Sequence, residues 1–259
     1  MHKIPGSIAI AWRWLGVLKH FLGGWATVVF IFPFLDQKGR NLKILNWSQR
    51  LLKLLRVDLI FQGIFPSKVC IIAANHISWL DIFLILAVHP ASFVSKSEIA
   101  NWPMIGRLLK AAQTTLIERH RRKAVHEALQ QMRHKLDKGL SVVFFPEGTT
   151  SDGSGLLPFH ANLFEVAMQA KTKPVAPPEA VIPLIPTAIR YLQEGEICFH
   201  AAYIGDTTLL QSIHTLITSG PLQAQVQVCK PLFSNEFTTR HALSKAAHLA
   251  IDEALRKYS

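Results

Sequence analysis

The chain has 259 residues, of which 49% are hydrophobic and only 17% are charged, and its formal net charge at pH 7 is +11. This composition is more apolar than that of most freely soluble proteins, and the positive charge favours anionic partners such as phospholipid headgroups, nucleic acid or an acidic carrier protein. The three cysteines stand far apart in apolar segments and are expected to be reduced core residues. No Cys-x2-Cys or His-Glu-x2-His spacing is present, so no metal site is predicted.

The N-terminal segment, residues 1–40, predicts a membrane anchor of one or two helices. It contains two apolar runs, residues 7–18 and 21–35, which a Lys-His pair separates. Neither run reaches the roughly 20 residues that a spanning helix needs, and a Gly-Gly pair and Pro33 are expected to kink the second run. Basic residues flank the segment on both sides, so the distribution of positive charge gives no clear direction of crossing. The favoured interpretation is a monotopic anchor that dips into the cytoplasmic leaflet of a membrane, with a single spanning helix as the alternative.

Residues 41–259 predict one α/β domain without internal repeats. Apolar, β-favouring runs alternate with segments of helical periodicity, which is the pattern of a mixed, largely parallel sheet flanked by helices. The predicted strands are residues 57–61, 69–74, 92–95, 114–117, 141–145, 181–186, 197–204 and 223–228. The predicted helices are residues 41–55, 79–88, 122–138 and 237–258, and the proline-rich residues 172–180 predict a surface loop.

The first motif with chemical meaning is Asn-His-x4-Asp, which follows the strand predicted over residues 69–74. His76 is a candidate general base, because a histidine with the ordinary pKa of about 6.5 is mostly neutral at pH 7. A carboxylate commonly fixes the tautomer of such a base, and Asp81 comes close to His76 if a helix begins near Ser78. Ser78 and Asp81 also match a capping box, in which Asp81 would only bond back to the helix start. Both interpretations require the same local geometry.

The second motif is Phe-Pro-Glu-Gly-Thr, which follows the strand predicted over residues 141–145. In a parallel sheet both motifs lie at the carboxyl edge, where α/β folds place their chemistry. Glu147, Gly148 and Thr149 predict a turn whose backbone N–H groups suit an anion or a developing oxyanion.

Two cations are candidates for anion binding at the same edge. Arg119 follows the strand predicted over residues 114–117, and its guanidinium suits a phosphate because it binds two oxygens at once. The alternative for Arg119 is membership of a solvated basic run, residues 119–123. Lys96, just past the strand predicted over residues 92–95, is a weaker candidate of the same kind.

The sequence offers no nucleophile of its own beside these motifs. It has no Gly-x-Ser-x-Gly elbow, which argues against an esterase, and no cysteine beside a histidine in a reactive context. It lacks the glycine patterns that bind nucleotide phosphates, and its basic residues are not interleaved with aromatic residues as in nucleic-acid binding. A His-Asp pair without a nucleophile indicates that a hydroxyl group of the substrate attacks directly.

With these motifs in this order, the chain resembles the 1-acylglycerol-3-phosphate acyltransferases, a family of glycerolipid acyltransferases, over roughly residues 69–186. Residues 93–119 resemble the segment that members use for the acceptor phosphate, and residues 181–186 resemble the block that helps to shape the acyl site. The resemblance implies that residues 41–259 are an acyltransferase domain that needs no cofactor or metal and takes acyl-CoA or acyl carrier protein as co-substrate. It further implies that His76 deprotonates the acceptor hydroxyl and that Asp81 orients His76. The residues that it assigns to the glycerol phosphate are Lys96, Arg119, Glu147, Gly148 and Thr149.

The sequence departs from the family pattern near the expected acceptor pocket. Thr150 stands where many relatives have arginine, His160 where they have lysine, and Gln113 where they have glycine. The two missing cations predict weaker selectivity for a phosphate headgroup, and residues 150–153 resemble relatives that acylate lyso-ornithine lipid. The leading hypothesis is the formation of phosphatidic acid from 1-acylglycerol-3-phosphate. Another lyso-lipid acceptor such as lyso-ornithine lipid is the alternative, and a non-catalytic lipid-binding membrane protein is the alternative of another class.

Overall fold

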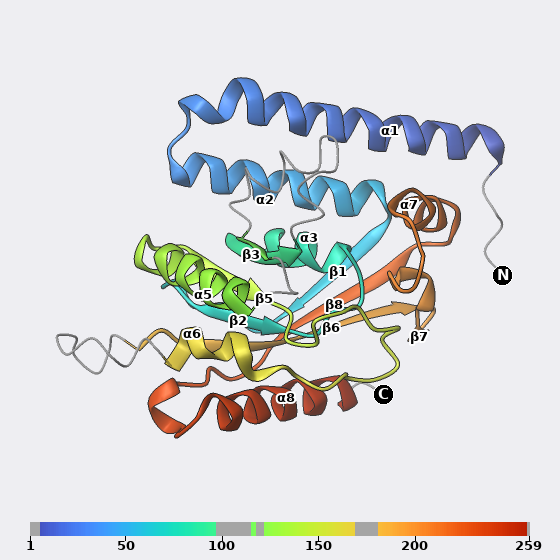
Figure 1. Ribbon diagram of the computed structural model, residues 1–259. Helices are drawn as coiled ribbons and strands as arrows, with labels where there is room; N and C mark the ends of the chain where they lie inside the picture. Colours follow the sequence, from blue (N-terminus) through green and yellow to red (C-terminus); the bar gives the residue numbers. More distant parts are fainter. Residues whose placement is uncertain (1–5, 97–114, 118–121, 169–180, 258–259) are drawn as a thin grey trace.

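An eight-stranded mixed sheet forms the centre of the computed structural model, which describes residues 6–96, 115–117, 122–168 and 181–257 (Figure 1). The strand order is β1-β8-β6-β2-β5-β3-β4, and β7 pairs with β6 outside this path. The α/β fold with a largely parallel sheet is confirmed. The strands are β1 (Val57–Gln62), β2 (Ile71–Ala74), β3 (Ala91–Lys96), β4 (Thr115–Ile117), β5 (Ser141–Phe144), β6 (Leu184–Gln193), β7 (Glu196–Ile197) and β8 (Leu222–Val228).

The strands that precede the two motifs are neighbours in the sheet. β2 pairs in parallel with β5 on one side and with β6 on the other, so Ile72 lies opposite both Val143 and Ile185. β5 also pairs in parallel with β3, and β3 pairs in parallel with β4. The carboxyl ends of these strands therefore meet at one edge, as the sequence predicts. β8 runs antiparallel to β6, which makes the sheet mixed.

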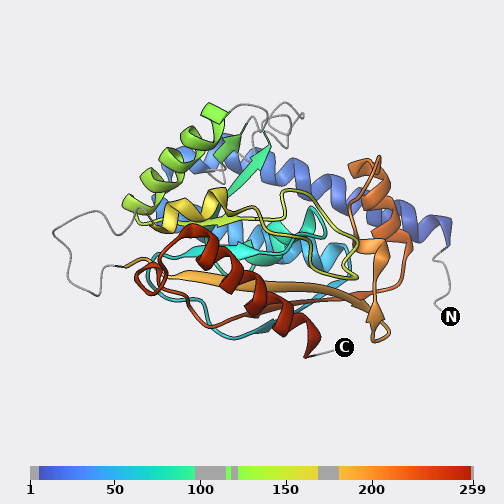
Figure 2. The ribbon, with the colours of Figure 1, turned by 60° about the horizontal axis from the view of Figure 1, so that its bottom comes forward.

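Helices cover both faces of the sheet, because its central strands are apolar on both faces. In β2, Ile71 and Ala73 pack into one buried cluster, whereas Ile72 and Ala74 pack into the other. Figures 1 and 2 show α8 on the face of the sheet that lies opposite α2 and α3. The helices on one face are α2 (Gln37–Leu54), α3 (Leu80–Leu86) and α7 (Leu209–Thr218), and those on the other are α5 (Arg122–Asp137), α6 (Glu165–Met168) and α8 (Arg240–Arg256).

Of the one or two helices expected at the N-terminus, the structure has one, which contains both apolar runs up to Phe34. α1 (Ser7–Ala26) passes through the Lys-His and Gly-Gly pairs without a break, and a π-turn and a 3-10 turn extend it to Phe34. The expected kink at the Gly-Gly pair does not occur. Gly24 instead allows Trp47 of α2 to pack closely against α1. A Cβ atom on Gly24 would lie 2.4 Å from Nε1 of Trp47 in α2. The segment Ser7–Phe34 is long and apolar enough, by length and composition, to cross a membrane.

α1 lies alongside α2 and also contacts α7 (Figure 1). The ring of His20 stacks on Trp47 of α2 with a centroid distance of 4.4 Å, and Arg13 donates a hydrogen bond of 2.6 Å to the carbonyl of Ile217 in α7. The boundary predicted after residue 40 falls inside α2, which begins at Gln37. The division into anchor and domain stays a prediction.

The outer face of α1 is apolar. Its large side chains are 38–77% exposed and recur at helical spacing, on the side opposite Val17 and Gly24, which are buried against the protein. They are Ile8, Trp12, Leu15, Leu18 and Leu22. A helix that lies against the protein and presents an apolar stripe outwards fits association with a membrane.

The strand predicted over residues 197–204 is wrong except at its start. Only Glu196 and Ile197 pair with β6, and a 3-10 turn over Phe199–Ala201 follows. A longer hairpin would continue along β6 to Ile189. The side chain of Asn75 already binds both the N–H and the C=O groups of Ile189, so the chain turns away.

The sequence analysis missed α7, although a local signal was present. Thr208 accepts a hydrogen bond from the backbone N–H of Gln211, and the Gln211 side chain accepts one from the backbone N–H of Thr208. This capping box marks the start of a helix in the sequence itself. The loop predicted over residues 172–180 lies outside the described residues.

Trp12→Glu combined with Leu22→Glu is expected to move the protein from the membrane fraction to the soluble fraction. Both side chains point away from the protein, at 67% and 47% exposure, so the fold is preserved while the apolar stripe gains two charges. Co-sedimentation with phospholipid vesicles measures the effect. Ile64→Glu is the matched control, because Ile64 is 86% exposed in the connection after β1. Equal sedimentation of the double variant and the wild type would contradict the anchoring role of this face.

Candidate functional site

The side chains of His76 and Asp81 form a hydrogen-bonded pair at the carboxyl end of β2. Nδ1 of His76 lies 2.7 Å from Oδ2 of Asp81, which is in the first turn of α3. The same oxygen accepts hydrogen bonds from the backbone N–H groups of Ile77, at 2.7 Å, and Ser78, at 2.9 Å. The contact with His76 and the bonds to the start of α3 that the two interpretations of Asp81 require therefore occur together.

The imidazole of His76 is held in a fixed orientation and remains accessible. Its ring stacks on Phe145 with a centroid distance of 3.9 Å and an interplanar angle of 8°. The side chain of His76 is 19% exposed, whereas that of Asp81 is fully buried. Because Nδ1 faces a carboxylate, Nδ1 carries the proton and Nε2 carries the lone pair. No described residue binds Nε2, so this nitrogen is free to accept a proton.

Hydrogen bonds to the backbone of the His76 loop join the two motifs. The N–H group of His76 donates to Oε1 of Glu147 at 2.6 Å, and the C=O group of His76 accepts from the N–H group of Ser151 at 2.8 Å. The C=O group of Ile77 accepts from the N–H group of Tyr203, at 2.9 Å. Thr150 donates through its hydroxyl to the carbonyl of Tyr203. The loop that carries His76 is therefore tied to the second motif and to the segment after β7.

The carboxylate of Glu147 is buried and bonded to backbone groups on both sides. Its second oxygen accepts a hydrogen bond of 3.1 Å from the N–H group of Leu157, and the residue is only 4% exposed. Burial raises the pKa of Glu147 to about 7, and the hydrogen bonds from His76 and Leu157 offset only part of that effect. Contact between Glu147 and the acceptor stays a prediction, and the structure gives its carboxylate a definite task in holding the His76 loop.

Gly148 and Thr149 are nearer the surface. The N–H group of Gly148 donates to the C=O group of Phe145 at 3.2 Å, which closes a turn after β5. Gly148 has a positive φ of 75°, a conformation that favours glycine. Thr149, the next residue, is exposed. Their predicted contacts with the acceptor stay predictions.

The two predicted cations are described only in part. Lys96 is the last residue of β3, so its backbone lies at the same edge of the sheet as the two motifs, and its side chain is outside the description. β4 ends at Ile117, and Arg119 lies outside the described residues. Their predicted roles in phosphate binding stay predictions.

Two polar side chains of the site were not assigned a role from the sequence. The hydroxyl of Tyr191 in β6 donates a hydrogen bond of 2.6 Å to Oδ1 of Asp81. The amide of Asn75 accepts from the N–H of Ile189 at 2.7 Å and donates to its C=O at 2.9 Å. A tyrosine in a buried strand needs a partner for its hydroxyl, and this was the one signal in the sequence for Tyr191.

Among the residues that the structure describes, no group of three or more His, Cys, Asp and Glu side chains is placed to hold a metal ion. The three cysteines are free thiols, and Cys70 and Cys198 are buried.

Comparisons with known proteins agree on one family. The family model described as Acyltransferase matches residues 56–190. A 1-acyl-sn-glycerol-3-phosphate acyltransferase from Neisseria gonorrhoeae is 35% identical over 187 residues, which cover 72% of this chain and 68% of the relative. A lyso-ornithine lipid O-acyltransferase from Pseudomonas aeruginosa is 31% identical over 248 residues, which cover 94% of this chain and 91% of the relative.

A solved structure has the same fold. The crystal structure of a 1-acyl-sn-glycerophosphate acyltransferase from Thermotoga maritima matches with a TM-score of 0.65 at 20% sequence identity. The match covers 95% of this chain and 97% of that protein. At this identity the likeness concerns the fold alone.

The stability that Glu147 contributes is expected to fall as pH rises. Its pKa of about 7 in the folded protein lies above the ordinary 4.5, so the folded state binds this proton more tightly than the unfolded chain does. The contribution is therefore fully present below pH 4.5 and is lost as pH rises through about 7. The stability advantage of wild type over Glu147→Gln should shrink by about 2–3 kcal/mol between pH 5 and pH 8.

Urea unfolding in detergent at the two pH values measures this difference. Glu127→Gln is the control, because Glu127 is an exposed carboxylate on α5, and its difference from wild type should be the same at both pH values. A pH-independent difference for Glu147→Gln would show that Glu147 stays ionised in the folded protein across this range.

Proposed function

The chain belongs to the Acyltransferase family, and from this premise we propose that it transfers a fatty acyl group from an acyl thioester to 1-acylglycerol-3-phosphate, which gives phosphatidic acid. The observation that carries the proposal is the 2.7 Å hydrogen bond between His76 and the buried carboxylate of Asp81. It leaves Nε2 of His76 accessible at the carboxyl edge of the sheet, without a protein nucleophile bound to it among the described residues. The attacking group therefore belongs to the substrate.

In the proposed reaction, Nε2 of His76 accepts the proton of the acceptor hydroxyl while the hydroxyl oxygen attacks the thioester carbonyl. The new C–O bond gives a tetrahedral intermediate with its negative charge on the former carbonyl oxygen. Collapse of this intermediate re-forms the carbonyl and breaks the C–S bond, and the departing thiolate takes the proton from His76. Asp81 stabilises the imidazolium that exists between the two proton transfers.

The acceptor phosphate is assigned to the cationic and backbone groups at the same edge. Lys96 is the last residue of β3, and Gly148 and Thr149 follow the buried Glu147 in the turn after β5. We include Arg119 in this set from the family pattern. An arginine and backbone N–H groups together suit a phosphate because they supply several donors to its oxygens.

The donor and the location follow the same reasoning. We propose that acyl-CoA or acyl carrier protein supplies the thioester at the cytoplasmic face of a bacterial inner membrane. The apolar outer face of α1 supports attachment to the bilayer, and the net charge of +11 supports contact with anionic lipids or an acidic carrier.

Lyso-ornithine lipid is the second candidate acceptor, and two observations favour it. Thr150 occupies the position where the family pattern has arginine, and its hydroxyl is bound to the carbonyl of Tyr203. The relative named for lyso-ornithine lipid matches over 94% of this chain. A pocket with fewer cations would bind a phosphate headgroup less selectively.

His76→Ala is expected to lower acyl transfer by about 10²–10⁴-fold, because a positioned base contributes that much to the attack of an alcohol. Asp81→Asn should lower it by at least about 100-fold with little loss of folded protein. The amide oxygen can keep the bonds to the backbone at the start of α3, and the amide group can donate to Tyr191, while the negative charge is lost. Turnover by purified, folded variants is the measurement, and Asp58→Asn, an exposed carboxylate in β1, is the control. Near-wild-type turnover of Asp81→Asn would reject the catalytic pair and leave only the helix-start role.

A competition between 1-acylglycerol-3-phosphate and lyso-ornithine lipid is expected to give both products with the wild-type protein. Thr150→Arg should shift product formation towards phosphatidic acid, because it restores a cation near the proposed acceptor site. Thr150→Val is the matched control, since it removes the hydrogen bond to Tyr203 without adding charge. Exclusive use of 1-acylglycerol-3-phosphate by the wild type would refute the weakened selectivity, and exclusive use of lyso-ornithine lipid would replace the leading acceptor by the second one.

A further inference from the structure

The catalytic carboxylate has a second partner that the reaction described above does not use. Oδ2 of Asp81 binds His76 and two backbone N–H groups, whereas Oδ1 accepts a hydrogen bond of 2.6 Å from the hydroxyl of Tyr191. Within the described part of the chain, Oδ1 has no other partner. The imidazole and the phenol therefore bind the two oxygens of one carboxylate, although Tyr191 lies 110 residues further along the chain.

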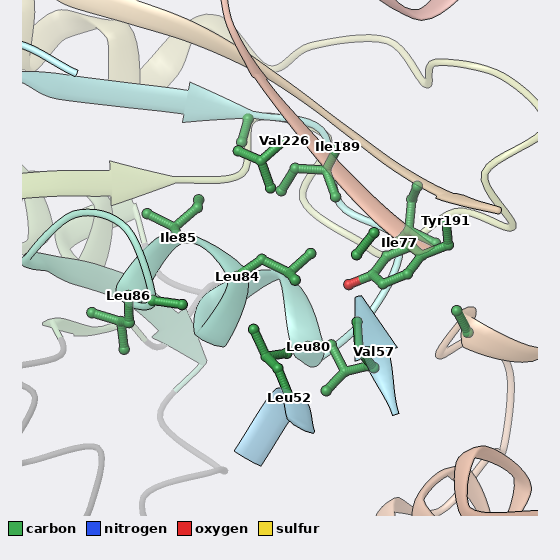
Figure 3. Close-up of a cluster of buried hydrophobic side chains, with 14 of the residues drawn as sticks. Leu52, Val57, Ile77, Leu80, Leu84, Ile85, Leu86, Ile189, Tyr191 and Val226 are labelled. Carbon is green, nitrogen blue, oxygen red and sulfur yellow. The ribbon is translucent and has the colours of Figure 1, made fainter. Parts of the chain in front are cut away.

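The neighbouring strand holds Tyr191 in place below the start of α3. β6 extends beyond the end of β2, so Ile189 has no strand partner on that side in the described structure. The side chain of Asn75 binds the backbone N–H and C=O groups of Ile189 in place of a strand. Residues two apart in a strand face the same side of the sheet. The two hydrogen bonds between Asn75 and Ile189 therefore also set the position of Tyr191. Figure 3 shows the Tyr191 ring among Ile77, Ile189 and other core residues, with its oxygen directed towards α3. The motif residue Asn75 thus fixes the strand that supports the motif residue Asp81.

The hydroxyl of Tyr191 keeps its proton at neutral pH and donates it in a hydrogen bond to Asp81. Tyr191 is 1% exposed, and burial together with the negative charge of Asp81 raises its pKa well above 10.0. A phenol that keeps its proton beside a carboxylate donates to it permanently. Such a charge-assisted bond is stronger than one between neutral groups.

We propose that Tyr191 is a positioning residue for acyl transfer, which holds the Asp81 carboxylate in the plane that His76 requires and limits how strongly that carboxylate binds the imidazolium. The proposal rests on the proposed function, in which His76 must be neutral to accept a proton. Without the phenol donor, more of the carboxylate charge is available to His76. The imidazolium is then favoured in the resting enzyme, and the carboxylate loses one of the two anchors that fix its orientation.

A purely structural role makes a different prediction. Tyr191 lies in the core cluster, and a buried hydroxyl needs some partner, which Asp81 supplies. If this were the whole role, Tyr191→Phe would change thermal stability without changing the dependence of the rate on pH. The pH profile therefore separates the two roles.

Tyr191→Phe is expected to lower kcat about tenfold at pH 7 with little change in KM. The acid side of the profile of kcat/KM should move towards higher pH by about one unit, which corresponds to a tenfold change in the protonation equilibrium. Phenylalanine preserves the ring that fills the core, so the variant is expected to fold. In the described structure, the other titratable side chains near the pair are Glu147, which faces Asp81, and Cys198, which faces Tyr191. Both are present in the wild type and in the variant, so neither accounts for a difference between the two pH profiles.

Two further variants make the test specific. Val226→Ala removes a fully buried side chain from the same cluster without touching Asp81, so it should lower thermal stability and leave the pH profile unchanged. In the Asp81→Asn background, Tyr191→Phe should have no further effect on the rate if it acts through Asp81. An unchanged profile for Tyr191→Phe, or a shift equal to that of Val226→Ala, would overturn the positioning role. Either result leaves the roles of His76 and Asp81 standing, because these depend on their own variants.

Discussion

One buried carboxylate, that of Asp81, joins three separate parts of the fold. It receives hydrogen bonds from the imidazole of His76, from the backbone at the start of α3 and from Tyr191 in β6. A carboxylate that is removed from water costs several kcal/mol unless its charge is compensated by such bonds. The His76 loop, the start of α3 and β6 are therefore all held at hydrogen-bond distance from the Asp81 carboxylate. The same hydrogen bonds that compensate the buried charge also fix the orientation of the His76 ring and of its Nε2 atom.

At the carboxyl edge of the sheet, polar side chains bind backbone groups that no neighbouring strand of the described structure reaches. β2 ends at Ala74, and the amide of Asn75 carries on the pairing with β6 by binding both backbone groups of Ile189. On the other side, the carboxylate of Glu147 binds the N–H of His76, which β5 no longer reaches. The strand ends can therefore separate enough to expose His76 without leaving unpaired buried backbone groups, which would be costly. Asn75 and Glu147 thus hold the His76 loop by binding backbone groups.

The N-terminal helix α1, whose outer face is apolar, is connected to the site through α7. Arg13 of α1 binds the carbonyl of Ile217 near the end of α7, and the indole N–H of Trp79 donates to the hydroxyl of Ser212 in the same helix at 2.9 Å. Trp79 directly precedes the buried helix α3. The apolar face of α1 and the His76 loop are therefore parts of one packed body.

Features encoded by neighbouring residues were determined by the sequence alone. The β-favouring runs predicted β2 and β5, and the contact between His76 and Asp81 followed because a helix start leaves a five-residue separation little freedom. The prediction of a strand over residues 197–204 was wrong, and the contacts of Tyr191 and Asn75 went unrecognised. These three features depend on the position of β6 beside β2 in the sheet. Only the tertiary structure decided that arrangement. Sheet order is set by packing of the whole chain, and no local pattern records which distant strand will supply the partner for a buried oxygen.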